Sequence, residues 1–459
     1  MRDLFHTIRN RIGKEGFVKN VFLLSSGAMI NIALNIFLTP IVTRIYHRDD
    51  YGFASLFVSI VNIAVLVVTL MYPSAIVIPK ENEKAYALVK ITFLLVTGSI
   101  VVSLLVYMTG LHTYFYSGDL SAYASWVFLI PVALIVVALD QITASLNVRD
   151  KEFRLNAKSN ITAGVLNKGI TIGSGFAVGS SQYGIIGGFL ISHFLSSVMR
   201  IGTSFKQAIR SSWNLKKLKE TALYYVNYPK YILPGDFINR FSRDSPLYFF
   251  TAYYDMTLVG SLAFAISMLT IPYNLIGASV SPVFIQKAGE LRDQSFERLR
   301  EFVTKLNRSL FLLGIIPFAI VVVFGGEIFA FVFSSEWREA GVFAGLLSVY
   351  FMFRLITSPM SSIFRVLEKE RITLIFNVFL FIGRIAVLYV ASWFFDATGI
   401  ILSFSIFSAV AYIVLMILTF RLVNLPWASQ LLKYIAMFYL TIGALWGIKY
   451  LSITLIPGL

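Results

Sequence analysis

Apolar stretches, each long enough to cross a lipid bilayer as a helix, follow one another along almost the whole chain. A bilayer core of about 30 Å needs about 20 helical residues at 1.5 Å each. The predicted spans lie near residues 20–43, 52–76, 86–109, 123–147, 157–179, 183–205, 229–253, 257–285, 303–325, 340–364, 372–395 and 398–420, with a further candidate at 431–456. This pattern predicts an all-α polytopic membrane protein.

Composition supports this prediction and excludes other classes. Hydrophobic residues make up 57% of the chain and charged residues only 14%, against about 25% charged in soluble domains. A soluble enzyme, a disordered chain and a disulfide-stapled secreted domain are thereby excluded. With no cysteine in the sequence, thiolate metal sites and cysteine nucleophiles are excluded too, and we expect no resident cofactor or metal.

Basic residues are distributed very unevenly between alternate loops. Of the 39 Lys and Arg, 30 fall on the side of the membrane that holds the N-terminus, four on the other side and five inside predicted spans. Positive residues accumulate on the cytoplasmic side of membrane proteins, so we expect a cytoplasmic N-terminus. The net charge of +15 is then explained by topology, and nucleic acid is not an expected partner.

The spans suggest two lobes of six helices, related by an axis along the membrane normal as in some transporters. A weak repeat supports this division, because Asp50 precedes Gly52 at one span start and Asp255 precedes Gly260 at another. Gly169 and Gly173, spaced as GxxxG, predict close helix packing. No loop is long enough for a catalytic domain, so we do not expect an enzyme. The expected regions are an amphipathic leader (1–19), an N-terminal lobe (20–205), a basic cytoplasmic linker (206–228), a C-terminal lobe (229–421) and an extra segment (422–459).

Charged residues inside the seventh span indicate a functional surface. Asp236, Arg240, Arg243 and Asp244 are spaced by three or four residues and share one helical stripe. They could neutralise one another within the helix. Ionised groups are nevertheless costly in hydrocarbon, so the stripe is expected to face water or a ligand.

Further polar residues lie near the middle of other spans. Lys168, Arg354 and Arg384 have no acid at helical spacing, and Lys168 could instead extend toward the membrane surface. Together with Arg240 and Arg243 they make five cations inside predicted spans. The acids inside spans number three, namely Asp140, Asp236 and Asp244. A cationic cavity predicts an anionic substrate, and guanidinium suits phosphate oxygens.

Four smaller predictions concern asparagines, a histidine, two arginines and the acids inside spans. Asn31 and Asn35 share a helical face and could bind sugar hydroxyls or join helices. His193 is interpreted as a packing residue. Arg44 and Arg48, at the outer end of the first span, are candidate outer-gate residues, and Asp140, Asp236 and Asp244 are candidates for H⁺ or Na⁺ coupling.

Several short motifs follow one another in order along the chain. They are TPIVTRIY (39–46), DYG (50–52), AIVIPK (75–80), YPKY (228–231), PVFIQKA (282–288), WREAG (337–341), SPMSSIF (358–364) and LEK (367–369). As a set they resemble the motifs of Wzx-type polysaccharide flippases, and the resemblance runs from about residue 20 to 380. Such proteins belong to the multidrug/oligosaccharidyl-lipid/polysaccharide (MOP) exporter superfamily, with two six-helix lobes around a V-shaped cavity.

The resemblance implies transfer of undecaprenyl-diphosphate-linked oligosaccharide repeat units across the bacterial cytoplasmic membrane, for O-antigen, capsule or exopolysaccharide. It also implies membrane lipids, a polysaccharide polymerase and chain-length machinery as partners. The sequence departs from the superfamily in two respects. Asn31 and Asn35 stand on the first span where relatives carry cavity arginines, and the segment at 431–456 makes the number of spans odd.

Other functions remain open at this stage. A cation-coupled drug exporter of the same superfamily would need an acid-rich cavity, whereas the interior of this chain has more cations than acids. A membrane glycosyltransferase or polymerase would need a sizeable outer loop, and the longest one, with Glu327, Glu336 and Glu339, is short. A static scaffold would leave the midplane cations unexplained.

Overall fold

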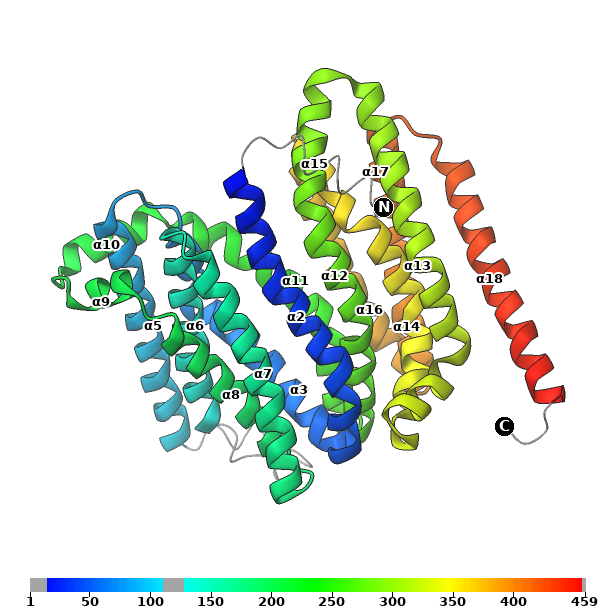
Figure 1. Cartoon of the computed structure of the whole chain (residues 1–459), viewed down its shortest axis with the longest axis horizontal. Coiled ribbons are helices and arrows are strands. Elements are labelled where there is room, and N and C mark those ends of the chain that lie inside the picture. Colours follow the sequence, from blue (N-terminus) through cyan, green and yellow to red (C-terminus); the bar gives the residue numbers. More distant parts are fainter. Residues whose placement is uncertain (1–14, 110–127, 456–459) are drawn as a thin grey trace. The chain divides into compact units, whose positions relative to one another are not determined.

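The computed structural model describes residues 15–109 and 128–455, and every regular element in these residues is helical (Figure 1). Earlier helices are α2 (Glu15–Ile45), α3 (Arg48–Thr69), α4 (Tyr72–Ala75), α5 (Asn82–Met108), α6 (Leu129–Arg149), α7 (Phe153–Val178), α8 (Gln182–Met199), α9 (Thr203–Arg210), α10 (Leu215–Tyr224) and η3 (Tyr228–Ile232). Later ones are α11 (Leu233–Tyr253), α12 (Met256–Gln294), α13 (Phe296–Phe333), η4 (Ser335–Trp337), α14 (Arg338–Thr357), η5 (Pro359–Ser362), α15 (Ile363–Val366), α16 (Glu370–Ser392), α17 (Ala397–Leu422) and α18 (Trp427–Leu455). Most of the predicted leader lies outside the described residues, as does the predicted loop at 110–122.

Nine helical stretches within the described residues are long and apolar enough to cross a membrane, or ten if the bent pair α8–α9 forms one span. The nine are α3, α5, α6, the first part of α12, α13, the stretch from η4 to α15, α16, α17 and most of α18. The protein is a multi-pass membrane protein, as predicted. Helices α7 and α11 also coincide with predicted spans but carry too many polar residues to pass the same test. Their polarity includes Lys168 on α7 and the charged stripe of α11, which the sequence marks as functional.

One predicted span differs in the structure, whereas the further candidate at 431–456 is helical as predicted. The predicted span at 183–205 ends at Met199, because the chain bends by 89° before α9 begins at Thr203. The candidate at 431–456 corresponds to one continuous helix, α18, which packs on α13. There the rings of Phe311 and Tyr434 stack with centroids 4.1 Å apart.

The chain divides into two compact units by its contacts. The first comprises residues 1–38, 57–178 and 183–237, and the second comprises 39–56, 179–182 and 238–459. In the second unit, Trp337 is fully buried and its indole Nε1 donates a hydrogen bond to the Thr43 carbonyl, with a donor–acceptor distance of 2.8 Å. The predicted boundaries of the lobes and the linker stay a prediction.

Glycines set one close helix contact in the second unit. A Cβ atom on Gly52 would lie 2.6 Å from the Gly260 nitrogen, and one on Gly260 would overlap the Arg48 carbonyl. The two glycines of the predicted repeat therefore face each other where α3 crosses α12. By contrast, Cβ atoms on Gly169 and Gly173 would have no neighbour within 4 Å, so the packing predicted from their spacing is wrong within the described structure.

Candidate functional site

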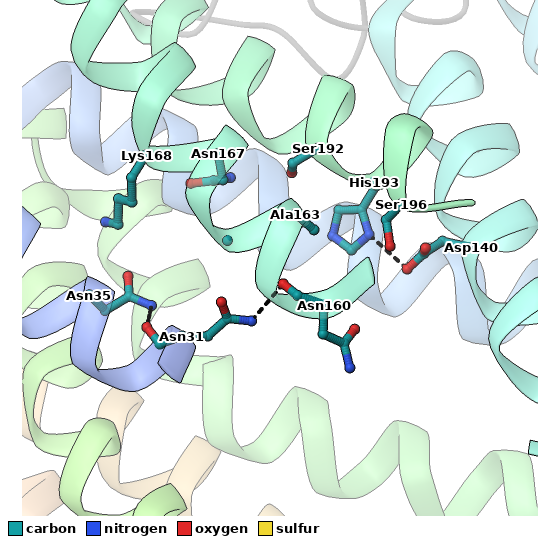
Figure 2. A pocket seen from close by; sticks show the side chains of 11 residues that line it. Asn31, Asn35, Asp140, Asn160, Ala163, Asn167, Lys168, Ser192, His193 and Ser196 are labelled. Atoms are coloured by element: carbon teal, nitrogen blue, oxygen red, sulfur yellow. Dashed lines mark hydrogen bonds and ion pairs between the residues drawn. The ribbon is translucent and has the colours of Figure 1, made fainter. Parts of the chain in front are cut away.

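A polar pocket of about 320 Å³ lies inside the first unit, among α2, α6, α7 and α8. Its lining residues are Asn31, Asn35, Asp140, Asn160, Ala163, Gly164, Asn167, Lys168, Ser192, His193 and Ser196 (Figure 2). The structure thus brings together Asn31, Asn35, Asp140 and Lys168, all four of which the sequence marks as candidates. Polar and ionisable groups inside a membrane bundle are costly, and they usually mark a substrate or ion pathway.

Asp140, on α6, is the centre of a charged network at one end of the pocket. Its carboxylate pairs with the Arg200 guanidinium, and His193 Nδ1 on α8 lies 3.1 Å from its other oxygen. Arg200 directly follows α8, its side chain is only 3% exposed, and it also donates to the Asn160 side-chain oxygen. The network therefore ties α6, α7 and the end of α8 together. His193 contacts this network and also lines the pocket.

Amide side chains line the wall between α2 and α7. Asn31 Nδ2 donates to the Asn160 carbonyl over 2.9 Å, and Asn35 Nδ2 donates to the Asn31 carbonyl over the same distance. The side-chain oxygen of Asn31 is buried and accepts no hydrogen bond from the described residues. Gly164 faces it, and a Cβ atom there would overlap the Asn31 side chain. Asn31 thus joins helices and also presents an unsatisfied acceptor.

Lys168 is the unpaired cation of this pocket. Figure 2 shows it near Asn35, with Asp140 and His193 at the opposite end of the view. No hydrogen bond or ion pair joins its ammonium to any described residue. Because Arg200 already pairs with Asp140, no carboxylate of the described residues compensates the positive charge of Lys168 in this pocket. Such a site favours an anionic or strongly hydrogen-bonding ligand.

Arg354 and Arg384 lie in the second unit, where aromatic rings and hydroxyls surround them. The Arg354 guanidinium lies 4.0 Å from the Tyr273 ring centroid and donates to the Tyr350 hydroxyl over 3.1 Å. Arg384, 2% exposed, donates to Ser408 Oγ over 3.1 Å and also to Ser242. Neither arginine pairs with a carboxylate of the described residues. Cation–π contact partly replaces the missing counter-charge.

The charged stripe of α11 contains one ion pair, between two residues adjacent in sequence. Arg243 Nε lies 3.0 Å from a carboxylate oxygen of Asp244, its direct neighbour in sequence. Arg240 is half-buried on the same helix, in the second unit, while Asp236 belongs to the first. Because Arg243 and Asp244 are neighbours in sequence, this pair is not one of the four-residue contacts of a self-neutralising ladder.

The two candidate gate residues differ in their surroundings. Arg48 pairs with Glu339 and donates to Ser261 Oγ over 3.1 Å, whereas Arg44 is exposed. Beside Arg48, His47 Nδ1 lies 3.3 Å from Glu336. Arg48 therefore joins the start of α3 to α12 and α14 within the second unit.

Sequence reasoning missed three residues of the first-unit site. Asn160 and Asn167 share the α7 face that carries Gly164, and their three- and four-residue spacing was a readable signal. Arg200 had none, because it stands at the end of an apolar run and resembles an ordinary basic loop residue. Arg200 is buried because it pairs with Asp140, which lies on another helix.

Residues 41–342 match the protein family described as "Polysaccharide biosynthesis protein". The chain belongs to this family. No curated protein matches the chain significantly. The matched region contains Arg240 and Arg243 and most residues of the polar pocket. Arg354 and Arg384 lie outside it.

Similarity to solved structures shows which fold this chain adopts. An inward-facing multidrug resistance MATE family transporter of the MOP superfamily is 14% identical, with a TM-score of 0.65, over 86% of this chain and 94% of its own. The lipid II flippase MurJ in an inward closed conformation is 15% identical, with a TM-score of 0.65, over 94% and 100%. A MOP superfamily transporter from Pyrococcus furiosus, described as having a binding pocket of reverse polarity, is 14% identical, with a TM-score of 0.56, over 88% and 96%. The predicted MOP-like fold is confirmed.

Proposed function

We propose that this protein moves undecaprenyl-diphosphate-linked oligosaccharide repeat units from the cytoplasmic to the outer leaflet of the bacterial cytoplasmic membrane. Alternating access would expose the substrate to each side in turn, and the product would supply O-antigen, capsule or exopolysaccharide synthesis. The polar pocket of the first unit carries this proposal. Its amides and hydroxyls can replace the hydrogen bonds that sugar hydroxyls lose on leaving water.

The family and the fold support the same function from another direction. The chain belongs to a polysaccharide biosynthesis family and has a transporter fold. We therefore expect it to carry a substrate that is related to polysaccharide and has to cross a membrane. One structure with this fold is named a lipid II flippase. We extend the flipping of a lipid-linked substrate to this chain, with an oligosaccharide as the transferred group.

The diphosphate would bind the cations that the sequence marks. Arg240 and Arg243 are half-buried on α11 and can reach a ligand, while Arg354 and Arg384 are buried and would act through their charge unless the helices move. Lys168 would contact the glycan or the phosphate nearest the first-unit pocket. Arg44 and Arg48 stay candidates for the outer gate. A polymerase and chain-length machinery would receive the product.

We also propose that transport is coupled to H⁺ or Na⁺ through Asp140, Asp236 and Asp244. Asp140 is the strongest candidate among them, because its carboxylate lines the polar pocket and lies 3.1 Å from His193 Nδ1. Asp236 and Asp244 are the corresponding candidates on α11. Outward movement of negative charge from a negative cytoplasm is also favoured by about 2.3 kcal/mol per charge per 100 mV.

Lys168→Glu is expected to reduce transport by about tenfold or more, which corresponds to about 1.4 kcal/mol. The substitution reverses the excess charge of the pocket without removing any hydrogen bond between described residues. Liposomes containing the purified protein and an undecaprenyl-diphosphate oligosaccharide would be assayed by lectin binding on the opposite leaflet. Lys369→Glu, an exposed position outside the pocket, serves as the matched control.

Two outcomes would count against this proposal. Equal transport by Lys168→Glu and Lys369→Glu would remove the first-unit pocket from the substrate path. No transport of several glycans by folded wild-type protein would argue against a flippase acting on this substrate class.

A cation-coupled exporter is the second candidate, since the MATE fold and a carboxylate in the first unit favour it. Arg200 already neutralises that carboxylate, which makes the pocket poor for cationic drugs. Binding of cationic dyes by the purified protein would support the exporter. Extension of glycan chains by purified protein would instead support a polymerase.

A further inference from the structure

The segment after α8 changes direction in a way that suits a membrane surface. Helix α8 ends at Met199, and α9 begins at Thr203 after a bend of 89°. If α8 crosses the bilayer, this bend lays α9 along the plane of the membrane. Lys206 and Arg210 of α9 are exposed, so the helix is too polar for the hydrocarbon core and suits the headgroup region.

One face of the α9–α10 segment (residues 203–224) is held firmly against α5. Ala208 and Leu218 are buried there, and the Tyr86 hydroxyl donates to the Gln207 side-chain oxygen over 2.6 Å. Lys90 Nζ donates to the carbonyls of Ser211 and Ser212 over 2.7 and 2.8 Å. The orientation of the segment is therefore set within the first unit, and its other face is left open.

The open face combines basic and apolar side chains. The exposed basic residues are Lys206, Arg210, Lys216, Lys217 and Lys219, and the single acid of the segment is Glu220. Between them, Trp213 is 54% exposed, Leu215 76% and Tyr224 69%. Aromatic and basic residues together are typical of membrane interfaces, where rings enter the headgroup layer and cations meet lipid phosphates. A soluble anion would need only the cations.

A small pocket of about 240 Å³ opens between α5 and α10 beside this face. Lys90 lines it, is 2% exposed and pairs with no carboxylate of the described residues. Two of its three N–H bonds are used by the two carbonyls, and the Trp213 ring centroid lies 5.2 Å from the ammonium. The third N–H is bound by no oxygen or nitrogen atom of the described residues and can donate to a ligand. Ser212, Asn214 and Lys217 line the same pocket, and Glu83 is already paired with Lys217. The pocket therefore keeps one uncompensated positive charge.

We propose that the α9–α10 segment is a binding site for anionic phospholipid in the leaflet on its own side of the membrane. The exposed lysines and arginine attract the headgroups, while Trp213 and Leu215 enter the interfacial layer. The phosphate of one lipid sits in the small pocket and accepts a hydrogen bond from Lys90. This site is separate from the polar pocket and does not depend on the transported substrate.

Quenching of Trp213 fluorescence tests this proposal directly. The full-length protein is reconstituted in vesicles that contain brominated phosphatidylglycerol or brominated phosphatidylcholine, and the signal of a Trp213→Phe variant is subtracted. We expect stronger quenching by the anionic lipid. Replacing Lys206, Arg210, Lys216 and Lys219 together by Gln should reduce that preference by about tenfold or more. A matched variant with Lys287, Arg298, Lys305 and Arg308 replaced by Gln removes equal charge elsewhere and should retain it.

Lys90→Met tests the small pocket by removing its buried cation. It also removes the hydrogen bonds to Ser211 and Ser212 and the contact with the Trp213 ring, so the readout is lipid release and not quenching. The variant should release bound phosphatidylglycerol more readily in native mass spectrometry than Lys287→Met, a variant at an exposed lysine outside the segment. Equal quenching by the two lipids, or an equal loss in both quadruple variants, would overturn the proposal. Displacement of the lipid by inorganic phosphate alone would assign the pocket to a soluble anion and would also overturn it.

Discussion

Asp140→Ala is expected to lower the free energy of unfolding by about 3 to 5 kcal/mol. The carboxylate is the only acid of the described residues that pairs with Arg200, whose side chain is 3% exposed. Without it, the guanidinium would stay buried with the Asn160 side chain as its remaining partner, and its Nε already lacks one. Thermal and denaturant unfolding of the purified protein in lipid nanodiscs would measure the loss.

Two further variants separate a buried charge from a lost contact. Glu368→Ala removes the acid of an exposed pair with Arg292 and should cost less than about 1 kcal/mol. The double variant Asp140→Ala/Arg200→Met removes both charges and should recover most of the stability. A double variant no more stable than Asp140→Ala would mean that an uncompensated charge is not the cause.

Gly260→Ala is expected to destabilise the second unit by about 1 to 3 kcal/mol. The new methyl group would overlap the Arg48 carbonyl, so α3 would have to move away from α12. That movement would also strain the ion pair between Arg48 and Glu339. Unfolding experiments in the same nanodiscs, together with the yield of folded protein, would report the effect.

Gly289→Ala is the matched control, since it lies on the same helix and its Cβ would meet nothing within 4 Å. Alanine favours a helix over glycine by up to about 1 kcal/mol, so this variant should be neutral or slightly stabilising. If Gly260→Ala and Gly289→Ala had the same stability, close approach of α3 and α12 would not be needed for folding.

Part of the candidate site could be predicted from the sequence and part could not. Lys168 and Asp140 are recognisable because ionisable side chains are rare inside apolar stretches. The different surroundings of these two residues cannot be recognised in the sequence. Asp140 is neutralised by Arg200, whereas Lys168 meets no partner among the described residues. A residue's neighbours across helices depend on how each helix is rotated about its axis, which hydropathy alone does not define.

The sequence by itself determined the helical membrane class and the approximate helix positions, and it predicts the sidedness. It could do so because each membrane helix satisfies its own backbone hydrogen bonds, so that length, apolarity and flanking charge are local properties. The tertiary structure alone decided that Arg200 is buried against Asp140, that α8 ends in a right-angle bend and that Gly52 meets Gly260. These features depend on contacts between segments far apart in the chain, and helix packing sets such contacts through side-chain shape and polar pairing.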